Sequence, residues 1–301
     1  MKRELRLLVT SACNYRCGFC HNEGVDFAED EKLSADDYIF LYKVFNEMFP
    51  NDEITITGGE PLVRSDIGDI LKAFKSIDVK TTLVTNGSLI FKNIDILTKN
   101  VSRVNVSLHS MNSKLYQSIT GTNKNALFHV KEGLAMLKST SSNIVIRLNS
   151  TFVKGANNSL DAVQSIISFA STINASVKFI ELYPKSSKLF VPIEIMVSYL
   201  EELGYTLLFH DDRQSSFQKD EEIVYLTKIF CAYSEHFKNR QEVCRDKQDL
   251  FITPSGKIKT CMNNNFGVSI YEDILNRDSK KLKYNILRAI NLFGNCTAYG
   301  K

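Results

Sequence analysis

The 301 residues include no tryptophan, no internal repeat, no low-complexity tract and no apolar run near the roughly 20 residues that span a bilayer. The missing apolar run excludes a transmembrane helix, whereas the missing tryptophan excludes no class of function. Basic residues are scattered and the net charge is only +3, so nothing indicates a nucleic-acid surface or a polybasic membrane anchor. A small anionic substrate remains compatible with this charge.

The residues that are present suit a soluble globular protein. Hydrophobic residues make up 44% of the chain, enough for a sizeable core in one large domain, or in one domain with a smaller C-terminal or N-terminal extension. Seven cysteines, three of them in one short run, fit a reducing cytoplasm better than a secreted disulfide scaffold. We therefore expect a cytoplasmic protein whose partners include neither a nucleic acid polymer nor a membrane.

Apolar runs of strand length alternate with amphipathic stretches of helix length up to residue 182. The expected strands are Leu5–Thr10, Glu53–Thr57, Lys80–Thr85, Arg103–Leu108, Asn143–Phe152 and Ser176–Leu182. The expected helices are Ala35–Phe49, Asp66–Ser76, Phe91–Lys99, Ala126–Lys138 and Ser159–Ser171. This alternation predicts an α/β fold with a parallel sheet, a partial (βα)6 TIM-like barrel. In βα barrels, ligands gather at the carboxyl ends of the strands.

The pattern changes after Leu182. We expect, in order, a helix at Val191–Leu203, a strand at Tyr205–Phe209, a polar linker at Asp211–Ser216, an apolar run at Ile223–Phe230, a hairpin around Pro254-Ser255-Gly256 and a closing helix at Lys280–Phe293. The prediction is therefore a barrel domain at residues 1–212 and a small C-terminal α+β domain at residues 213–301. The four cysteines outside the short run all lie in this second part.

Cys13, Cys17 and Cys20 form a Cys-x3-Cys-x2-Cys run just after the first expected strand. Three thiolates on one loop can hold three irons of a 4Fe–4S cube and leave the fourth iron open for chemistry. Zinc is disfavoured, because His21 adjoins Cys20 too closely to complete a tetrahedron. Three cysteines cannot pair internally without leaving one over, and charged residues interrupt the apolar stretch that a lipoprotein signal needs.

The loop resembles that of the radical S-adenosylmethionine (SAM) enzymes. In that family the open iron chelates the amino and carboxylate groups of SAM, and the reduced cluster cleaves the sulfonium to give a 5′-deoxyadenosyl radical. The resemblance implies that Cys13, Cys17 and Cys20 hold the catalytic cluster. It also implies an external reductant such as flavodoxin or ferredoxin.

Gly58, Gly59 and Glu60 follow the second expected strand. Two glycines let a ligand approach the backbone closely, and a carboxylate can accept hydrogen bonds from an ammonium group. An ordinary tight turn is the alternative. After the cysteine loop, these residues resemble the Gly-Gly-Glu element that holds the amino group of SAM. His109, after the fourth strand, is interpreted as a local hydrogen-bonding residue rather than a catalytic base.

Several segments narrow the resemblance to the GTP 3′,8-cyclase of molybdenum-cofactor biosynthesis. They are Cys13–Gly24, Thr57–Arg64, Thr85–Gly87, Arg103–Leu108, Ile119–Gly121 and Lys178–Leu182. The similarity implies that Phe19 and Ser107 contact SAM and that Arg6 and Arg147 bind an anionic substrate. The sequence departs from the family at Thr55, Asp249 and Phe251, where the family has basic residues. The departures weigh against GTP itself, since each charged hydrogen bond is worth roughly 1.5–3 kcal/mol.

Cys244 and Cys261, with Gly256 between them, resemble the shortened auxiliary-cluster module called twitch. Cys231 and Cys296 are free to complete a set of four ligands for a second 4Fe–4S cluster. The alternative is that some of these four are buried, inert thiols.

The resemblance thus predicts a radical SAM enzyme that acts on a small anionic substrate, a nucleotide or nucleoside. A peptide maturase or a small-alcohol dehydrogenase with an auxiliary cluster is the alternative enzyme. Only four residues precede the first expected strand, which disfavours the leader-binding domain that peptide maturases often carry. An iron–sulfur electron carrier or sensor is the non-enzyme alternative, and such a protein would not need a Gly-Gly-Glu element.

Overall fold

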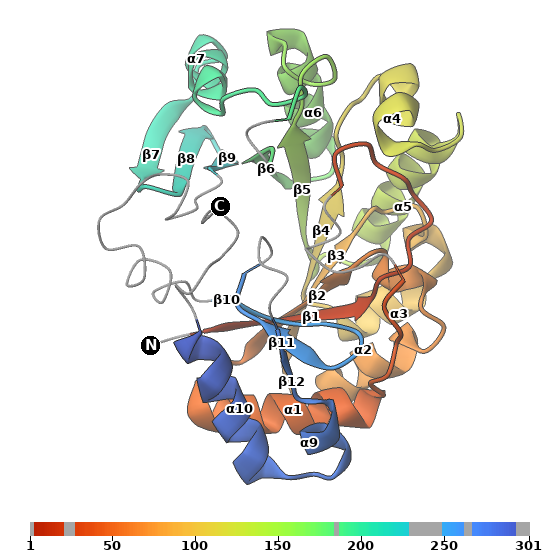
Figure 1. Ribbon diagram of the computed structural model, residues 1–301. Coiled ribbons are helices and arrows are strands. Elements are labelled where there is room, and N and C mark those ends of the chain that lie inside the picture. The colour runs from red at the N-terminus through yellow and green to blue at the C-terminus, as the bar shows by residue number, and fades with distance from the viewer. Residues whose placement is uncertain (1–2, 21–27, 184–186, 229–248, 262–266, 293–301) are drawn as a thin grey trace.

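The computed structural model describes residues 3–20, 28–183, 187–228, 249–261 and 267–292, and its strands form one curved sheet (Figure 1). The strand order is β12-β11-β10-β1-β2-β3-β4-β5-β6-β9-β8-β7. The six central parallel strands are β1 (Glu4–Thr10), β2 (Glu53–Gly58), β3 (Lys80–Thr85), β4 (Arg103–Ser107), β5 (Val145–Phe152) and β6 (Ser176–Glu181). They confirm the expected partial barrel.

Both edges of this parallel sheet are extended by later segments. The added strands are β7 (Thr206–His210), β8 (Gln214–Lys219), β9 (Glu222–Thr227), β10 (Asp249–Ile252), β11 (Lys257–Lys259) and β12 (Val268–Ser269). β9 pairs with β6 and β10 pairs with β1, both in parallel. The expected division after residue 212 therefore falls in the turn between β7 and β8, and the described strands on either side of it share one sheet.

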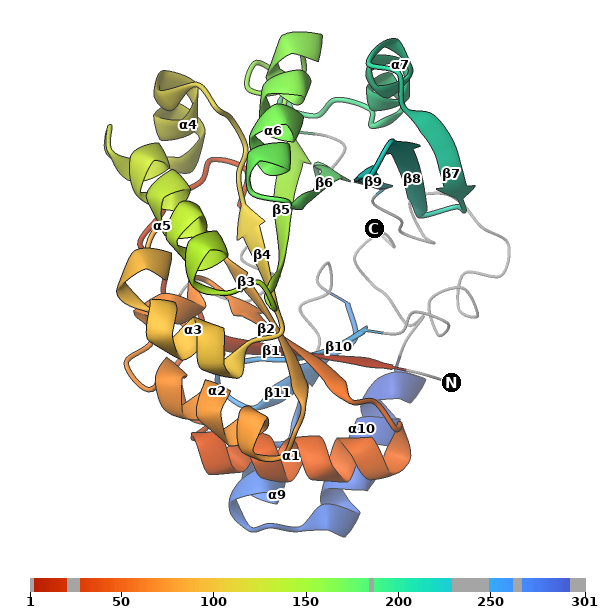
Figure 2. The same cartoon turned by 180° about the vertical axis from the view of Figure 1, so that it is seen from behind.

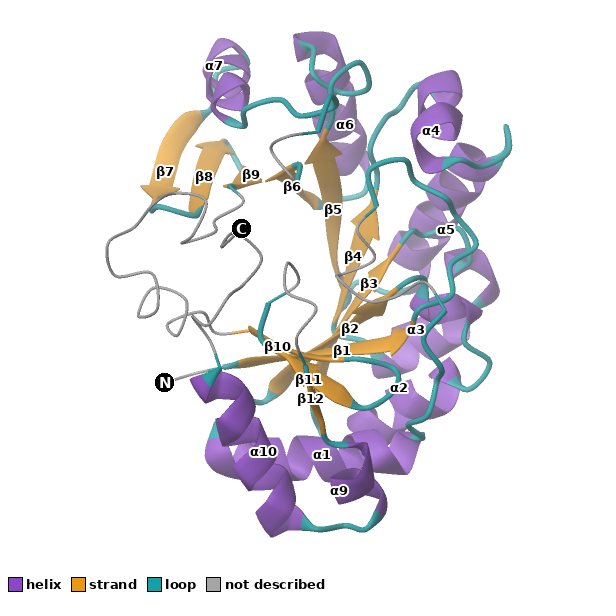
Figure 3. Cartoon of the chain, in the orientation of Figure 1, coloured by secondary structure: helices purple, strands orange, loops and turns teal. Residues whose placement is uncertain are grey.

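Helices cover the outer side of the sheet, as Figures 2 and 3 show. They are α1 (Ala35–Met48), α2 (Ile67–Ser76), α3 (Ile94–Asn100), α4 (Ser113–Thr120), α5 (Ala126–Thr140), α6 (Leu160–Thr172), α7 (Glu194–Glu202), α9 (Tyr271–Leu275) and α10 (Ser279–Asn291). Short 3-10 turns at Pro61–Val63 and Ile90–Lys92 follow β2 and β3. Within the described residues, no helix is both long and apolar enough to cross a membrane.

The alternation of side chains along the strands separates the core from the site. On β5, Ile146, Leu148 and Phe152 are buried, whereas Arg147 and Asn149 on the opposite face are only half-buried. Successive side chains of a strand point to opposite faces. One face of each strand therefore packs with the helices, and the other is free to build the interior of the barrel.

One local expectation was wrong, and one helix was not expected. Residues 214–216 are not a linker but the start of β8, which pairs antiparallel with both β7 and β9 and buries Phe217. Sequence reasoning also placed no helix at α4. The signal was present, because the Asn112 side chain accepts hydrogen bonds from the first-turn N–H groups and Gly121 ends the helix in the left-handed conformation.

Candidate active site

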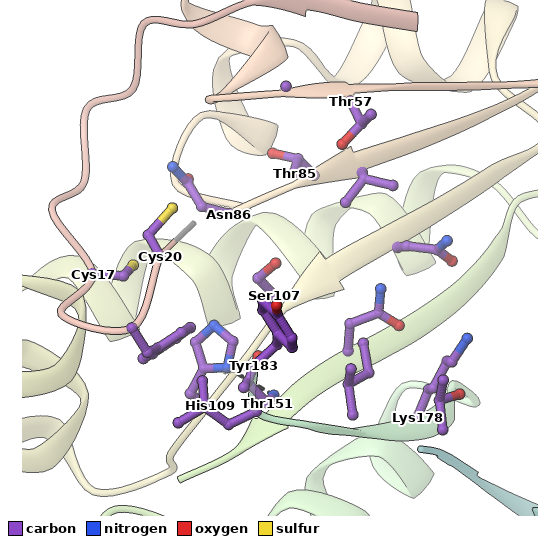
Figure 4. A pocket seen from close by; sticks show the side chains of 18 of the residues that line it. Cys17, Cys20, Thr57, Thr85, Asn86, Ser107, His109, Thr151, Lys178 and Tyr183 are labelled. Carbon is purple, nitrogen blue, oxygen red and sulfur yellow. Dashed lines mark hydrogen bonds between the residues drawn. The ribbon is translucent and has the colours of Figure 1, made fainter. Parts of the chain in front are cut away.

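The inner side of the sheet encloses a cavity of about 420 Å³. Its wall is built from alternate residues of neighbouring strands, such as Ser107 of β4, Asn149 of β5 and Lys178 of β6, which are register partners across the sheet. Figure 4 shows Cys17 and Cys20 at one end of the lining and Lys178 at the other. The two-residue period of parallel strands thus gathers side chains that are far apart in sequence.

Most of the residues selected from the sequence meet in this cavity. Its lining includes Arg6, Cys13, Cys17, Phe19, Cys20, Gly58, Gly59, Ser107, Arg147 and Cys261. Glu60 is fully buried and is not part of the lining. Cys231, Cys244, Cys296 and His21 lie outside the described residues.

The carboxyl end of α4 holds the cysteine loop in place. The backbone N–H of Arg16 donates to Thr120 O at 3.0 Å, and that of Gly18 donates to Ile119 O at 3.1 Å. Gly121 lies so close that a Cβ atom there would come within 2.6 Å of Arg16 O. The helix that the sequence did not reveal therefore positions the loop.

The three thiols of the loop fit an iron–sulfur cube better than a lone ion. None of the three forms a disulfide, and burial, followed by repulsion from Cys20 and Cys13, raises the pKa of Cys17 to about 12. Bound iron would relieve this repulsion between thiolates. Among the described residues, no three His, Cys, Asp or Glu side chains converge closely enough to hold a single metal ion. A cube instead spreads its thiolate ligands over separate corners.

Hydrogen bonds from the protein reach the first thiol. The backbone N–H of Tyr15 donates to Cys13 Sγ at 3.4 Å, and Asn86 Nδ2 lies 4.0 Å from the same sulfur. Donors of this kind orient and tune the sulfur ligands of a metal site. The surroundings of Cys13 therefore suit a cluster ligand.

The glycines after β2 are needed for packing against the cysteine loop. The N–H of Gly59 donates to Thr10 O and that of Glu60 to Ala12 O, both at 2.8 Å. A Cβ at Gly59 would overlap Ala12 O, and Gly58 has a positive φ of 127°. Both glycines also line the cavity. The structure thus gives a reason for glycine here that is separate from the expected close approach of a ligand.

Glu60 joins two turns from behind the cavity wall. Its carboxylate accepts hydrogen bonds from the Thr85 hydroxyl at 2.7 Å, from Leu62 N at 3.0 Å and from Asn86 N at 2.6 Å. Burial raises its pKa to about 7. Glu60 therefore fixes the turn after β2 against the turn after β3, whose Asn86 adjoins the cysteine loop.

His109 makes the local hydrogen bond expected of it. Its Nδ1 atom accepts from Thr151 N at 3.1 Å, and burial lowers its pKa to about 4, so the ring is neutral and its proton is on Nε2. The ring also packs edge-to-face on Phe19, with centroids 4.8 Å apart. This contact fixes the aromatic side chain next to the third cysteine.

Cations gather in the part of the cavity away from the cysteines. Arg147 Nε donates to Ser176 Oγ at 3.3 Å, and its guanidinium lies 4.6 Å from the centre of the Tyr225 ring. Lys178 lies on the next strand, and burial, then Arg147 and Arg6, lower its pKa to about 8. Sequence reasoning did not select Lys178; the signal was a lysine between the apolar residues Val177 and Phe179 of an expected strand.

Arg6 is partly neutralised by a carboxylate. Its Nη1 atom lies 3.4 Å from Glu4 Oε1, which also accepts a hydrogen bond from the Thr55 hydroxyl at 2.7 Å. The guanidinium of Arg6 lies 5.7 Å from the centre of the Phe251 ring. Among the described residues, no carboxylate forms an ion pair with Arg147 or Lys178, although Glu4 attracts Lys178 at longer range.

Comparison with known proteins identifies the family. Residues 7–163 match the Radical SAM superfamily. A protein of Pyrobaculum aerophilum named "Probable GTP 3′,8-cyclase" is 32% identical over 297 residues, which cover 96% of this chain and 93% of that protein. A protein of Thermococcus kodakarensis with the same name is 30% identical over 273 residues, 87% of this chain and 85% of its own.

Solved structures share the fold. Streptococcus suis SuiB bound to S-adenosylmethionine matches all of this chain with a TM-score of 0.64 and 18% identity, and this chain spans 65% of that one. Native anSMEcpe with bound AdoMet matches 99% of this chain and 81% of its own, with a TM-score of 0.59 and 12% identity. The chain therefore belongs to the radical SAM superfamily and is an enzyme whose cofactors are SAM and a 4Fe–4S cluster.

Proposed function

We propose that this enzyme reductively cleaves SAM and uses the resulting 5′-deoxyadenosyl radical to remove a hydrogen atom from a small anionic substrate of the nucleotide or nucleoside class. One observation carries the proposal: the cysteine loop and the cations Arg147 and Lys178 face the same cavity. A cofactor held at one end and an anion held at the other would bring the reacting atoms together, which is how a site lowers the barrier by proximity.

The residues divide into a cofactor end and a substrate end. Cys13, Cys17 and Cys20 would hold the cluster. The same end of the cavity is lined by Phe19, Gly58, Gly59 and Ser107, which we assign to SAM. Glu60 is a positioning residue in this assignment, because its carboxylate is used within the protein. The bound cluster and SAM would supply the radical, and the chain supplies the geometry.

Charge supports an anionic substrate. Arg147 and Lys178 are neighbours on β5 and β6, and ion pairs and charged hydrogen bonds of a bound anion would compensate the repulsion that Lys178 feels from Arg147. Arg6, the third basic residue of this group, is already paired with Glu4. We infer a substrate with less negative charge than GTP, since Asp249 and Phe251 line the wall where the cyclase family has arginines.

A second cluster would lie beside the same cavity. Cys261 is half-buried in the cavity wall, and we propose that it holds an auxiliary 4Fe–4S cluster together with Cys231, Cys244 and Cys296. An auxiliary cluster there could accept an electron from the substrate radical. The C-terminal part from residue 213 onwards would then serve as the auxiliary-cluster module.

The test is anaerobic turnover of reconstituted protein. With dithionite and SAM, the enzyme should release 5′-deoxyadenosine, whereas a Cys17→Ala variant should release none. A panel of deuterated nucleosides, nucleoside monophosphates and nucleoside triphosphates should show deuterium transfer into 5′-deoxyadenosine for the true substrate. If the wild-type enzyme, loaded with iron and sulfide, forms no 5′-deoxyadenosine, the proposed function is wrong.

A further inference from the structure

The cysteine loop has a second face, directed away from the barrel interior. On that side a separate hollow of about 430 Å³ is lined by the loop residues Asn14 and Tyr15, by the turn after β3 and by the turn that leads into α5. Tyr15 belongs to the lining of both the cavity and this hollow. The loop is therefore the wall between them.

Hydrogen bonds hold this wall in one position. Asn14 Nδ2 donates to Ser88 Oγ at 2.9 Å, and Asn86 Nδ2 donates to Asn14 Oδ1 at 2.7 Å. The Tyr15 ring packs edge-to-face against Tyr116, with centroids 6.4 Å apart. The loop that carries the three thiols is therefore fixed against residues that line the hollow.

Two lysines lie at the hollow. Lys92 belongs to its lining, which contains no aspartate or glutamate, and Lys124 is exposed next to the lining residue Asn123. Glu132 lies at the edge, 3.8 Å from His129 Nδ1. Exposed positive charges of this kind attract acidic proteins and accelerate their association.

Aromatic side chains stand beside these charges. Phe91 stacks on His129 with ring centroids 5.6 Å apart, and Phe128, whose ring packs edge-to-face with that of His129, is 63% exposed. Large aromatic residues at the centre of a polar surface are typical anchors of protein interfaces. We call the surface formed by Phe91, Lys92, Lys124, Phe128 and His129 the outer face.

We propose that the outer face is the docking site of an acidic one-electron carrier protein of the flavodoxin type. The inference rests on the proposed function, which requires an electron from outside for each SAM that is cleaved. The cavity side of the loop is assigned to SAM and substrate, so the carrier must approach from the opposite side. One electron would pass from the reduced carrier, which is oxidised by one electron, to the cluster held by the loop.

Charge reversal on the outer face tests the proposal. The reconstituted enzyme and its K92E/K124E variant are compared with two reductants, a flavodoxin reduced by its NADPH-dependent reductase, and dithionite. We expect the flavodoxin-driven rate of 5′-deoxyadenosine formation to fall about tenfold at low salt, with a weaker dependence on salt, because steering is lost. The dithionite-driven rate should stay unchanged, because a small reductant needs no docking surface.

Two further variants serve as a charge-matched control and as a test of the aromatic contact. K72E/K75E carries the same charge change on α2, away from the lining of the hollow, and should keep the wild-type flavodoxin rate. Phe128→Ala leaves the charge unchanged and should also slow the flavodoxin-driven reaction. In a binding assay with labelled flavodoxin, which needs no turnover, K92E/K124E should bind about tenfold more weakly than the wild type.

The outcomes separate this inference from the proposed function. Equal flavodoxin affinity and rate in the wild type and K92E/K124E would overturn the docking site, and so would an equal loss of the flavodoxin-driven and dithionite-driven rates. Failure of the wild-type enzyme to cleave SAM with dithionite would count against the proposed function alone, because the binding assay would still decide where the carrier docks.

Discussion

Replacing Gly59 by alanine tests why glycine follows β2. Two backbone hydrogen bonds, Gly59 N to Thr10 O and Glu60 N to Ala12 O, join this turn to the start of the cysteine loop. A Cβ at residue 59 would overlap Ala12 O and would lie 2.7 Å from Ser11 O. Backbone atoms cannot turn aside as a flexible side chain can. The loop must therefore move away from the turn.

The expected loss of stability follows from these contacts. Overpacking typically costs about 1–3 kcal/mol, and each weakened backbone hydrogen bond costs about 0.5–1.5 kcal/mol. We expect Gly59→Ala to lower the free energy of unfolding by about 2–6 kcal/mol, measured by urea denaturation of the metal-free protein. Iron content after anaerobic reconstitution should fall as well, because Cys13 directly follows the displaced Ala12.

Gly18 provides the matched control within the same loop. A Cβ at residue 18 would have no atom within 4 Å, so Gly18→Ala should leave stability within about 0.5 kcal/mol of the wild type. If Gly59→Ala matches Gly18→Ala in stability and iron content, packing is not the reason for glycine at this position. The close approach of a ligand would then be the better explanation.

Three further predictions concern Glu60, Lys178 and Cys261. Glu60 has a folded pKa of about 7, above its ordinary value of 4.5, so its contribution to stability is complete below pH 4.5 and is lost as the pH rises through 7. Glu60→Gln should remove about 3 kcal/mol of this pH dependence, measured by urea unfolding at several pH values. Lys178 has a folded pKa of about 8, below its ordinary value of 10.5, so its charge destabilises the fold below pH 8 and this penalty disappears as the pH rises toward 10.5. Lys178→Met should therefore stabilise the metal-free protein at pH 7 by about 1–3 kcal/mol while weakening substrate binding. Lys178→Arg should restore binding. An unfolding free energy at pH 7 unchanged by Lys178→Met would contradict the assigned burial. Cys261→Ala should reduce the iron content of the reconstituted enzyme from about eight to about four atoms per chain, and an unchanged content would remove Cys261 from the auxiliary cluster.

Local sequence patterns were sufficient to predict the parallel strands of the fold. Each of β1 to β6 is an apolar run of strand length, and the helices between them carry apolar residues at helical spacing, so burial alone dictates both types of element. The cysteine loop could also be recognised from the sequence, because its three cysteines lie within eight residues. Polar segments gave weaker signals. Residues 214–216 resemble a linker, and only pairing with two neighbouring strands makes them part of β8.

The site depended on the tertiary structure wherever it combines distant strands. Lys178 is one lysine among many in the sequence, and its lowered pKa arises only when folding buries it and brings Arg147 of the adjacent strand near it. Glu60 was expected to reach the cofactor, yet folding places Thr85 and Asn86 around its carboxylate and withdraws it from the cavity. The sequence by itself determined the chemistry that three neighbouring thiols can support, since the covalent chain keeps the three cysteines close together. The tertiary structure decided which side chains share that cavity and which carboxylates are already paired, because burial and electrostatic interactions depend on distances that only folding sets.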